Sequence, residues 1–149
     1  MSFDFTISSG IHQEILKHCQ ASLPNEACGF LARDIHTQEQ HFHPIGNDAA
    51  SPRFFSMNPK EQLRAERAME ETGQQLEAIV HSHPLSEAFP SRTDLKQAHW
   101  PESDELIHPG IPWLIISLED PDKPSMRVFL MKGDNHPDDI EEGKVVGLE

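Results

Sequence analysis

HSHPLSEAFPSRTD, residues 81–94, is the stretch of the chain from which the fold can be worked out. It follows the apolar run LEAIV, which is typical of a buried strand, and the proline after the second histidine would end that strand. Because alternate side chains of a strand share one face, we expect His81 and His83 to project together. Ser91 then indicates the start of a short helix, with Asp94 in its first turn. The stretch therefore predicts a strand, a loop and a helix that bring two imidazoles and a carboxylate together.

This combination of side chains suits a metal site. Zinc at a catalytic site commonly takes three protein ligands and leaves the fourth position to water. In a chain with ten histidines, chance alone gives about 0.7 His-x-His pairs, so the pair by itself is weak evidence. Requiring the serine and the aspartate at their offsets lowers that expectation to about 0.004. A capping box is the alternative, in which Ser91 and Asp94 only satisfy backbone amides at the start of the helix.

Other histidines of the chain lack this context. His41 and His43 form a second pair in HFHP, but a phenylalanine stands where the aspartate would be, so we expect ordinary strand residues. His99 precedes the segment PESDELIHPGIP, residues 101–112, and His108 lies within it; neither has a partner at ligand spacing. We expect both to be solvated surface histidines.

The rest of the chain alternates short strand patterns with helical ones. Asn58 is the expected N-cap of the clearest helix, with Pro59 at its first position and Gly73 as its stop. Strands are expected at residues 2–8, 27–33, 40–46, 76–84, 112–119, 125–133 and 144–149, and helices at 8–24, 58–73 and 91–100. The second and third of these strands should pair across a polar turn. The mixture of hairpins and helical crossovers predicts an α+β fold, a mixed sheet with helices packed against it, in a single domain over residues 1–149.

Charge and composition narrow the possible partners and the location. With 12 basic and 25 acidic residues the formal net charge is -13, which argues against nucleic acid or an anionic membrane as a partner. The start, MSFDFTISSG, has no basic leader or long apolar segment, and no apolar run is long enough to cross a bilayer. We expect a cytoplasmic protein. Cys19 and Cys28 lack the spacing of a zinc ribbon or redox pair, so free thiols are expected.

The pattern H-x-H-P-x6-S-x2-D, together with the glutamate in PNEACGFLA, resembles the JAMM, or MPN-plus, zinc metallopeptidases. The phrases NEACGFLA, SPRFF and SEAFPSRTD look most like the small bacterial enzymes that release cysteine from a ubiquitin-like sulfur-carrier protein during cysteine biosynthesis. The resemblance implies the cytidine-deaminase-like JAMM fold, a mixed curved sheet between helices. It also implies a zinc-dependent hydrolase whose partner is a ubiquitin-like (ThiS/MoaD-like) carrier protein, cut after its C-terminal Gly-Gly.

Site residues follow from the same resemblance. It implies that His81, His83 and Asp94 bind Zn²⁺, that Glu26 is the general acid and base, and that Ser91 helps to stabilise the oxyanion. We interpret Cys28, two residues after the glutamate, as buried structure and not as a nucleophile, because the nearby histidines would be committed to metal.

Two other functions remain open at this point. One keeps the chemistry and changes the substrate, for example to an isopeptide bond of a different ubiquitin-like protein. The other is a non-catalytic MPN scaffold that binds a ubiquitin-like partner, although such modules usually lose ligands that this chain retains. The segment 101–112 is longer and more acidic than the resemblance leads one to expect. The resemblance therefore does not predict the substrate contacts on that side.

Overall fold

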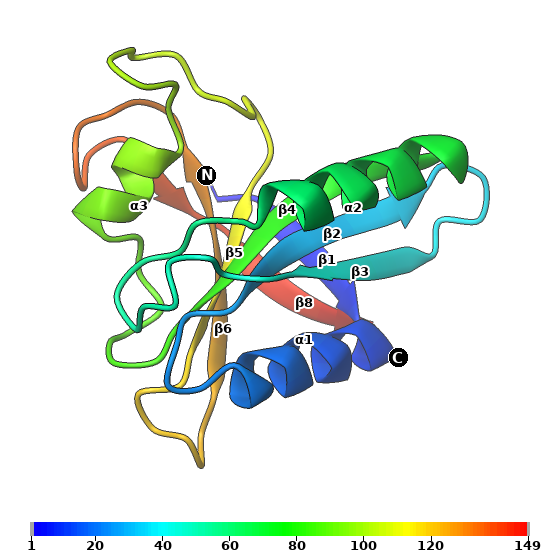
Figure 1. Cartoon of the computed structure of the whole chain (residues 1–149), viewed down its shortest axis with the longest axis horizontal. Helices are drawn as coiled ribbons and strands as arrows, with labels where there is room; N and C mark the ends of the chain where they lie inside the picture. Colours follow the sequence, from blue (N-terminus) through cyan, green and yellow to red (C-terminus); the bar gives the residue numbers. More distant parts are fainter. Residues whose placement is uncertain (1, 149) are drawn as a thin grey trace.

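The computed structural model describes residues 2–148, which form a six-stranded sheet, a separate two-stranded sheet and three helices (Figure 1). Along the chain the elements are β1 (Asp4–Ser8), α1 (Ser9–Ala21), β2 (Cys28–Asp34), β3 (Gln40–Ile45), α2 (Pro59–Glu71), β4 (Gln74–His83), α3 (Arg92–Gln97), β5 (Trp113–Ser117), β6 (Ser125–Met131), β7 (Ile140–Glu142) and β8 (Lys144–Leu148).

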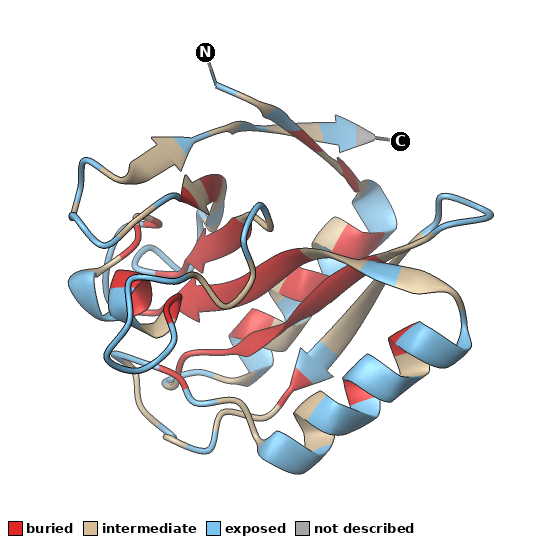
Figure 2. Cartoon of the chain, turned by 90° about the horizontal axis from the view of Figure 1, so that it is seen from above, coloured by how far each residue is buried: buried red, intermediate tan, exposed pale blue. Residues whose placement is uncertain are grey.

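The large sheet is mixed, with β4 near its middle. Its strand order is β3-β2-β4-β5-β6-β7, in which β4 and β5 are parallel and every other neighbouring pair is antiparallel. The small sheet pairs β1 with β8 in parallel. The buried residues lie along the central strands and on the inward sides of the helices (Figure 2). A strand in this central position has both of its faces covered.

Helices cover the two faces of the sheet unequally. On one face, Ile15 of α1 packs in a buried cluster that includes Val80 of β4. On the other face, Met69 of α2 and Leu95 of α3 share a cluster with Ile79, the neighbour of Val80 on the same strand. Because successive strand residues point to opposite faces, His81 and His83 lie in phase with Ile79. Both histidines therefore belong to the side of the sheet that α2 and α3 cover.

The helix ends follow the expected capping chemistry. The Ser8 hydroxyl accepts a hydrogen bond from the Ile11 amide at 3.3 Å at the start of α1. Asn58 does the same for the Glu61 amide at 3.0 Å at the start of α2. The Glu61 carboxylate accepts a hydrogen bond from the Gly46 amide at 3.1 Å. It therefore joins the end of β3 to α2 and fixes the base of the loop between them.

The structure confirms the α+β class and the mixed sheet between helices. Residues 27–33 and 40–46 pair as predicted, in β2 and β3. The sequence did not predict β7, whose three residues Ile140–Glu142 have little pattern of their own and pair with the end of β6. The last strand, β8, pairs within the chain, with β1. None of the helices described between residues 2 and 148 combines the length and apolar character needed to cross a membrane.

Candidate metal centre

Three buried side chains converge at the carboxyl end of β4. The His83 Nε2 atom lies 2.9 Å from Asp94 Oδ2, and the His81 Nε2 atom lies 3.2 Å from the same oxygen. The two Nε2 atoms are 3.1 Å apart. Each of the three residues is at most 4% exposed. Within residues 2–148, they are the one group of three potential ligands whose donor atoms approach closely enough to share a metal ion.

Asp94 reaches the histidines because α3 begins beside the end of β4. Ser91 is the N-cap of this helix: its hydroxyl oxygen accepts from the Asp94 amide at 3.0 Å, and its own amide donates to Asp94 Oδ2 at 2.9 Å. The Asp94 carboxylate thus completes the capping box and also faces both histidines. Because the Ser91 oxygen accepts from the backbone, its hydroxyl hydrogen is left for another acceptor.

The imidazoles are fixed by their surroundings. His83 Nδ1 donates to the Glu87 carbonyl oxygen at 2.8 Å, an outer contact of the kind that orients metal-ligating histidines and directs Nε2 at the metal. The His81 ring lies 4.9 Å from the Phe55 ring and 5.4 Å from the Trp113 ring, measured between centroids. These aromatic contacts leave the His81 ring little freedom to turn.

Glu26 lies two residues before the start of β2, the antiparallel neighbour of β4. The amide of Ala27 donates to the Ser82 hydroxyl at 2.8 Å, and the Ser82 amide donates to the Ala27 carbonyl at 3.0 Å. The Glu26 amide donates to the Ser51 carbonyl at 2.8 Å. These contacts hold Glu26 between the end of β4 and the loop before α2, and the residue is only 3% exposed.

The ionisable groups of this cluster shift one another's pKa values. Burial raises the pKa of Glu26 to about 8, and the Asp94 charge adds to this while His83 opposes it. Burial also acts to raise the pKa of Asp94, but the charges and hydrogen bonds of the two histidines outweigh it, and that pKa is lowered. Burial lowers the pKa of His81. Burial acts likewise on His83, but its hydrogen bonds to Asp94 and Glu87 prevail and raise its pKa.

The unpaired atoms of the cluster indicate what it can hold. Asp94 Oδ1, Glu26 Oε1 and His81 Nδ1 are buried and have no hydrogen-bond partner among the described residues. Buried polar atoms are normally paired, so three such orphans in one cluster indicate a ligand or a bound water. Two imidazole nitrogens and one carboxylate oxygen form a donor set that suits a divalent metal ion. The residues present therefore fit a metal centre with three protein ligands.

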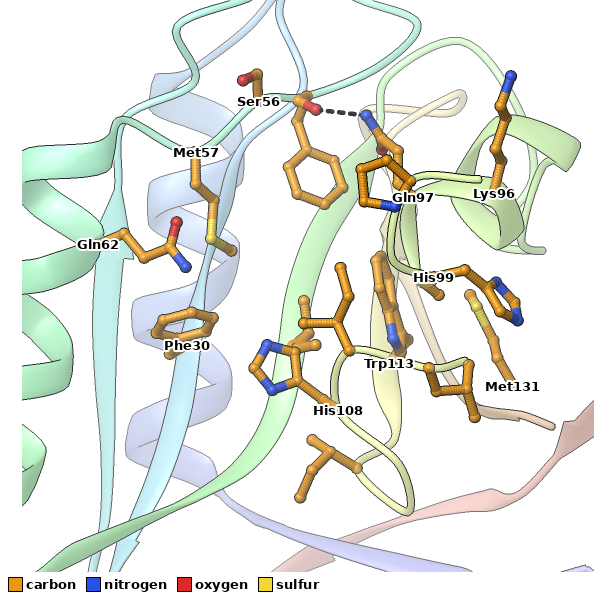
Figure 3. Close-up of a pocket in the computed structure, with 17 residues that line it drawn as sticks. Phe30, Ser56, Met57, Gln62, Lys96, Gln97, His99, His108, Trp113 and Met131 are labelled. Carbon is orange, nitrogen blue, oxygen red and sulfur yellow. Dashed lines mark hydrogen bonds between the residues drawn. The ribbon is translucent and has the colours of Figure 1, made fainter. Parts of the chain in front are cut away.

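A cavity of about 480 Å³ adjoins this cluster on the side of α2 and α3 (Figure 3). Phe55 and Trp113, the two rings that contact His81, form part of its wall. The Gln97 side-chain amide donates to the Phe55 carbonyl at 2.9 Å and so joins α3 to the loop before α2. Leu106 and Ile111 of the segment 101–112 contribute further apolar wall. Neither Phe55 nor Trp113 could be assigned to the site from the sequence, because a contact with a histidine ring leaves no pattern there.

The structure confirms the prediction for His41 and His43 and contradicts the prediction for His99 and His108. His41 and His43 are strand residues of β3, as predicted, and His43 Nε2 lies 2.8 Å from the Gln74 side-chain oxygen. The prediction that His99 is a solvated surface residue is wrong. His99 is 5% exposed, and its Nδ1 donates to the Leu95 carbonyl at 2.7 Å. His108 is half-buried, with its ring edge against Phe30, so it too is not fully solvated.

Both cysteines are free, as predicted, and both are buried, as predicted for Cys28. Burial raises the pKa of the Cys19 thiol to about 12 and that of the Cys28 thiol to about 12. A thiolate is the reactive form, so neither residue is suited to nucleophilic attack near neutral pH. The cysteines therefore contribute packing and are not candidates for nucleophilic chemistry.

Comparison with known proteins gives a consistent family match. The family model of prokaryotic homologues of the JAB domain, Prok-JAB, matches residues 8–131. A CysO-cysteine peptidase of Mycobacterium tuberculosis is 32% identical over 124 residues, which cover 83% of this chain and 80% of that protein. A desampylase of Haloferax volcanii is 33% identical over 108 residues, covering 68% of this chain and 78% of the relative.

Solved structures agree with this match. The solution structure of protein DSY2949 from Desulfitobacterium hafniense is similar with a TM-score of 0.78 and 34% identity, covering 97% of this chain and 92% of that one. A JAB1/MPN domain protein from Archaeoglobus fulgidus is similar in fold, with a TM-score of 0.54 and 20% identity, covering 97% of this chain and all of that one. The expected JAMM fold is thus confirmed.

Proposed function

This chain belongs to the Prok-JAB family, and we propose from that premise that it is a zinc-dependent hydrolase that cuts the bond after the C-terminal Gly-Gly of a ubiquitin-like sulfur-carrier protein. The carrier would be released from cysteine or a short peptide attached to its last glycine. The similarity to a CysO-cysteine peptidase supports this choice of reaction and substrate class.

The convergence of His81, His83 and Asp94 beside the buried Glu26 is the observation on which the proposal rests. In it, the first three residues bind Zn²⁺ and Glu26 is the general acid and base. A zinc ion bound there supplies Lewis acidity, which makes water a stronger acid and a carbonyl carbon more electrophilic. A scaffold that only binds a partner has no need for this buried, partly unpaired set of polar groups.

Glu26 has the main proton-transfer role in the proposed reaction. Its carboxylate takes a proton from the attacking water and returns it to the leaving amine, because an amine leaves poorly unless it is protonated. Burial beside Asp94 raises its pKa, while a divalent cation nearby would lower that pKa again. Both forms of the carboxyl group are therefore accessible near neutral pH, as a group that accepts and then donates a proton requires.

Ser91 contributes its hydroxyl hydrogen, which the capping hydrogen bond leaves available. We propose that it donates to the oxyanion that forms during attack. We expect Ser91→Ala to lower kcat by about 10 to 100-fold. Loss of some oxyanion donors lowers kcat by up to about 1000-fold, but here a bound metal ion would share the stabilisation of the negative oxyanion. The same change should cost about 1 kcal/mol of folding stability through the lost cap.

Ser91→Gly separates the two roles, since glycine at an N-cap costs only a few tenths of a kcal/mol. Steady-state kinetics should show a similar fall in kcat for the glycine and alanine variants, while thermal unfolding should show a smaller loss of stability for glycine. A glycine variant with the kcat of the unmodified protein would limit Ser91 to capping.

The substrate is tested directly by incubating the zinc-loaded protein with a carrier whose C-terminal Gly-Gly is extended by cysteine. Mass spectrometry should show loss of the added cysteine and an intact carrier ending in Gly-Gly. An extended glycine tail suits a narrow site, because it can approach where side chains would collide. If the zinc-loaded protein leaves this substrate uncut over long incubation, the proposed substrate is rejected.

A second candidate substrate has its own support. The similarity to a desampylase favours an isopeptide bond between a ubiquitin-like protein and a lysine side chain. The same assay can include a carrier joined to a lysine-containing peptide through its C-terminal glycine. Preferential cleavage of this conjugate over the cysteine adduct would favour the second candidate and keep the chemistry unchanged.

A further inference from the structure

The loop between His83 and Ser91 is fixed by contacts from outside the metal cluster. Residues 85–87 are exposed, so this part of the loop has little core of its own. The Ser117 hydroxyl of β5 donates to the Ser86 carbonyl at 2.6 Å. At the far end of the loop, His136 Nε2 lies 2.8 Å from the carbonyl oxygen of Pro90. A carbonyl oxygen can only accept, so His136 Nε2 donates this hydrogen bond.

His136 comes from a compact connection between β6 and β7. The Asn135 amide donates to the Asp139 carboxylate at 2.8 Å, and the Asp139 amide donates to the Asn135 carbonyl at 2.7 Å. At Gly133, a Cβ atom would lie 2.5 Å from Asp139 Oδ2, so the two ends of the connection lie close together. This closed turn presents the imidazole in one place.

Aromatic packing holds the same imidazole from the side. The His136 ring lies 5.9 Å from the Phe89 ring, which lies 5.3 Å from Phe129 of β6. The Arg127 guanidinium lies 5.7 Å from the centre of the Phe89 ring and is paired with Glu142 of β7 at 2.8 Å. The loop that precedes Ser91 is therefore fastened to the β6–β7 hairpin through both Phe89 and Pro90.

We propose that His136 is a positioning residue of the metal centre. Its hydrogen bond fixes the Pro90 carbonyl and with it the peptide that carries the Ser91 amide. That amide donates to Asp94 Oδ2 at 2.9 Å, the oxygen that faces both histidines. The Prok-JAB match ends at residue 131, so this brace comes from a segment that the family model does not cover. The inference rests on the metal centre proposed above.

Two variants separate the hydrogen bond from the packing. His136→Gln keeps a donor at the position of Nε2 and loses the ring, whereas His136→Phe keeps a ring against Phe89 and loses the donor. Outer contacts of metal ligands are worth about 10 to 100-fold in metal affinity. We expect His136→Phe to weaken Co²⁺ and Zn²⁺ binding about tenfold and to change the visible absorption of bound Co²⁺. His136→Gln should stay within about threefold of the unmodified protein and keep its absorption.

Matched controls are His36→Gln and His36→Phe, at an exposed histidine on the turn between β2 and β3. Affinity is measured by competition with a chromogenic chelator, and kinetics on a cleaved substrate should show a lower kcat with an unchanged KM for His136→Phe.

The inference is overturned if both His136 variants bind metal as tightly as the controls. It is also overturned if the glutamine variant is impaired as much as the phenylalanine variant, or if either one fails to fold, because His136 would then be a general structural residue. Metal binding and cobalt absorption need no substrate, so failure of the cleavage assay would reject the proposed reaction and leave this inference in place.

Discussion

Replacing Asp94 with alanine is expected to abolish tight zinc binding and, with it, hydrolysis. The carboxylate is one of three proposed ligands, and its Oδ2 lies within 3.2 Å of both Nε2 atoms. Loss of a hydrogen bond that orients a metal ligand typically weakens metal binding by about 10 to 100-fold. Loss of the ligand itself should therefore weaken zinc binding by more than about 100-fold. Metal analysis after gel filtration should show about one equivalent of zinc in the unmodified protein and almost none in the variant.

Alanine also removes half of the capping box, so a second variant is needed to assign the effect. Asp94→Asn retains an oxygen that can accept from the Ser91 amide and removes the negative charge. We expect Asp94→Asn to lose zinc while its thermal unfolding stays closer to that of the unmodified protein. Asp122→Asn, on an exposed turn between β5 and β6, is the matched control. Full zinc content in both Asp94 variants would contradict the proposed centre.

Replacing Glu26 with glutamine should leave zinc bound but strongly reduce turnover, unlike the Asp94 variants, which should lose the zinc itself. General acid and base catalysis is typically worth 10² to 10⁴-fold, so we expect kcat to fall by about that range. Glutamine has the same shape, and burying a neutral amide avoids the desolvation that raises the pKa of the Glu26 carboxyl to about 8. The variant should therefore fold at least as stably as the unmodified protein.

The test of Glu26 needs both kinetics and metal content. Single-turnover cleavage of the carrier adduct measures the chemical step, and competition with a chelator measures zinc affinity. Glu39→Gln, on the exposed turn between β2 and β3, should change neither quantity. If Glu26→Gln cleaves as fast as this control, the proton transfer must be assigned to a different group.

Much of the site could be predicted because strand geometry is simple. His81 and His83 share a face for the same reason that Ile79 and Val80 belong to opposite clusters. The capping box was also visible in the sequence. What the sequence left open was whether Asp94 caps the helix or faces the histidines, and the structure shows that one carboxylate oxygen does both. The roles of the site residues, and a single domain over residues 1–149, stay predictions.

The contacts around the site could not be predicted, because they join residues far apart in the chain. Phe55 contacts His81 only because the β3–α2 loop folds over the end of β4, and Trp113 does so because β5 lies beside β4. His99 was expected in solvent, but its ring turns back to the Leu95 carbonyl at the end of α3 and becomes buried. No local pattern distinguishes such a histidine from one on the surface.

The pairing of β1 with β8 has a consequence for biosynthesis. Residues 4–8 leave the ribosome early, but they can pair only after residues 144–148 have been made. Until then, Phe5 and Ile7, which are 7% and 1% exposed in the folded protein, lie on a segment whose partner strand is missing. We therefore expect the nascent chain to need chaperone protection at this stage, and a product truncated before residue 144 to be prone to aggregation and proteolysis.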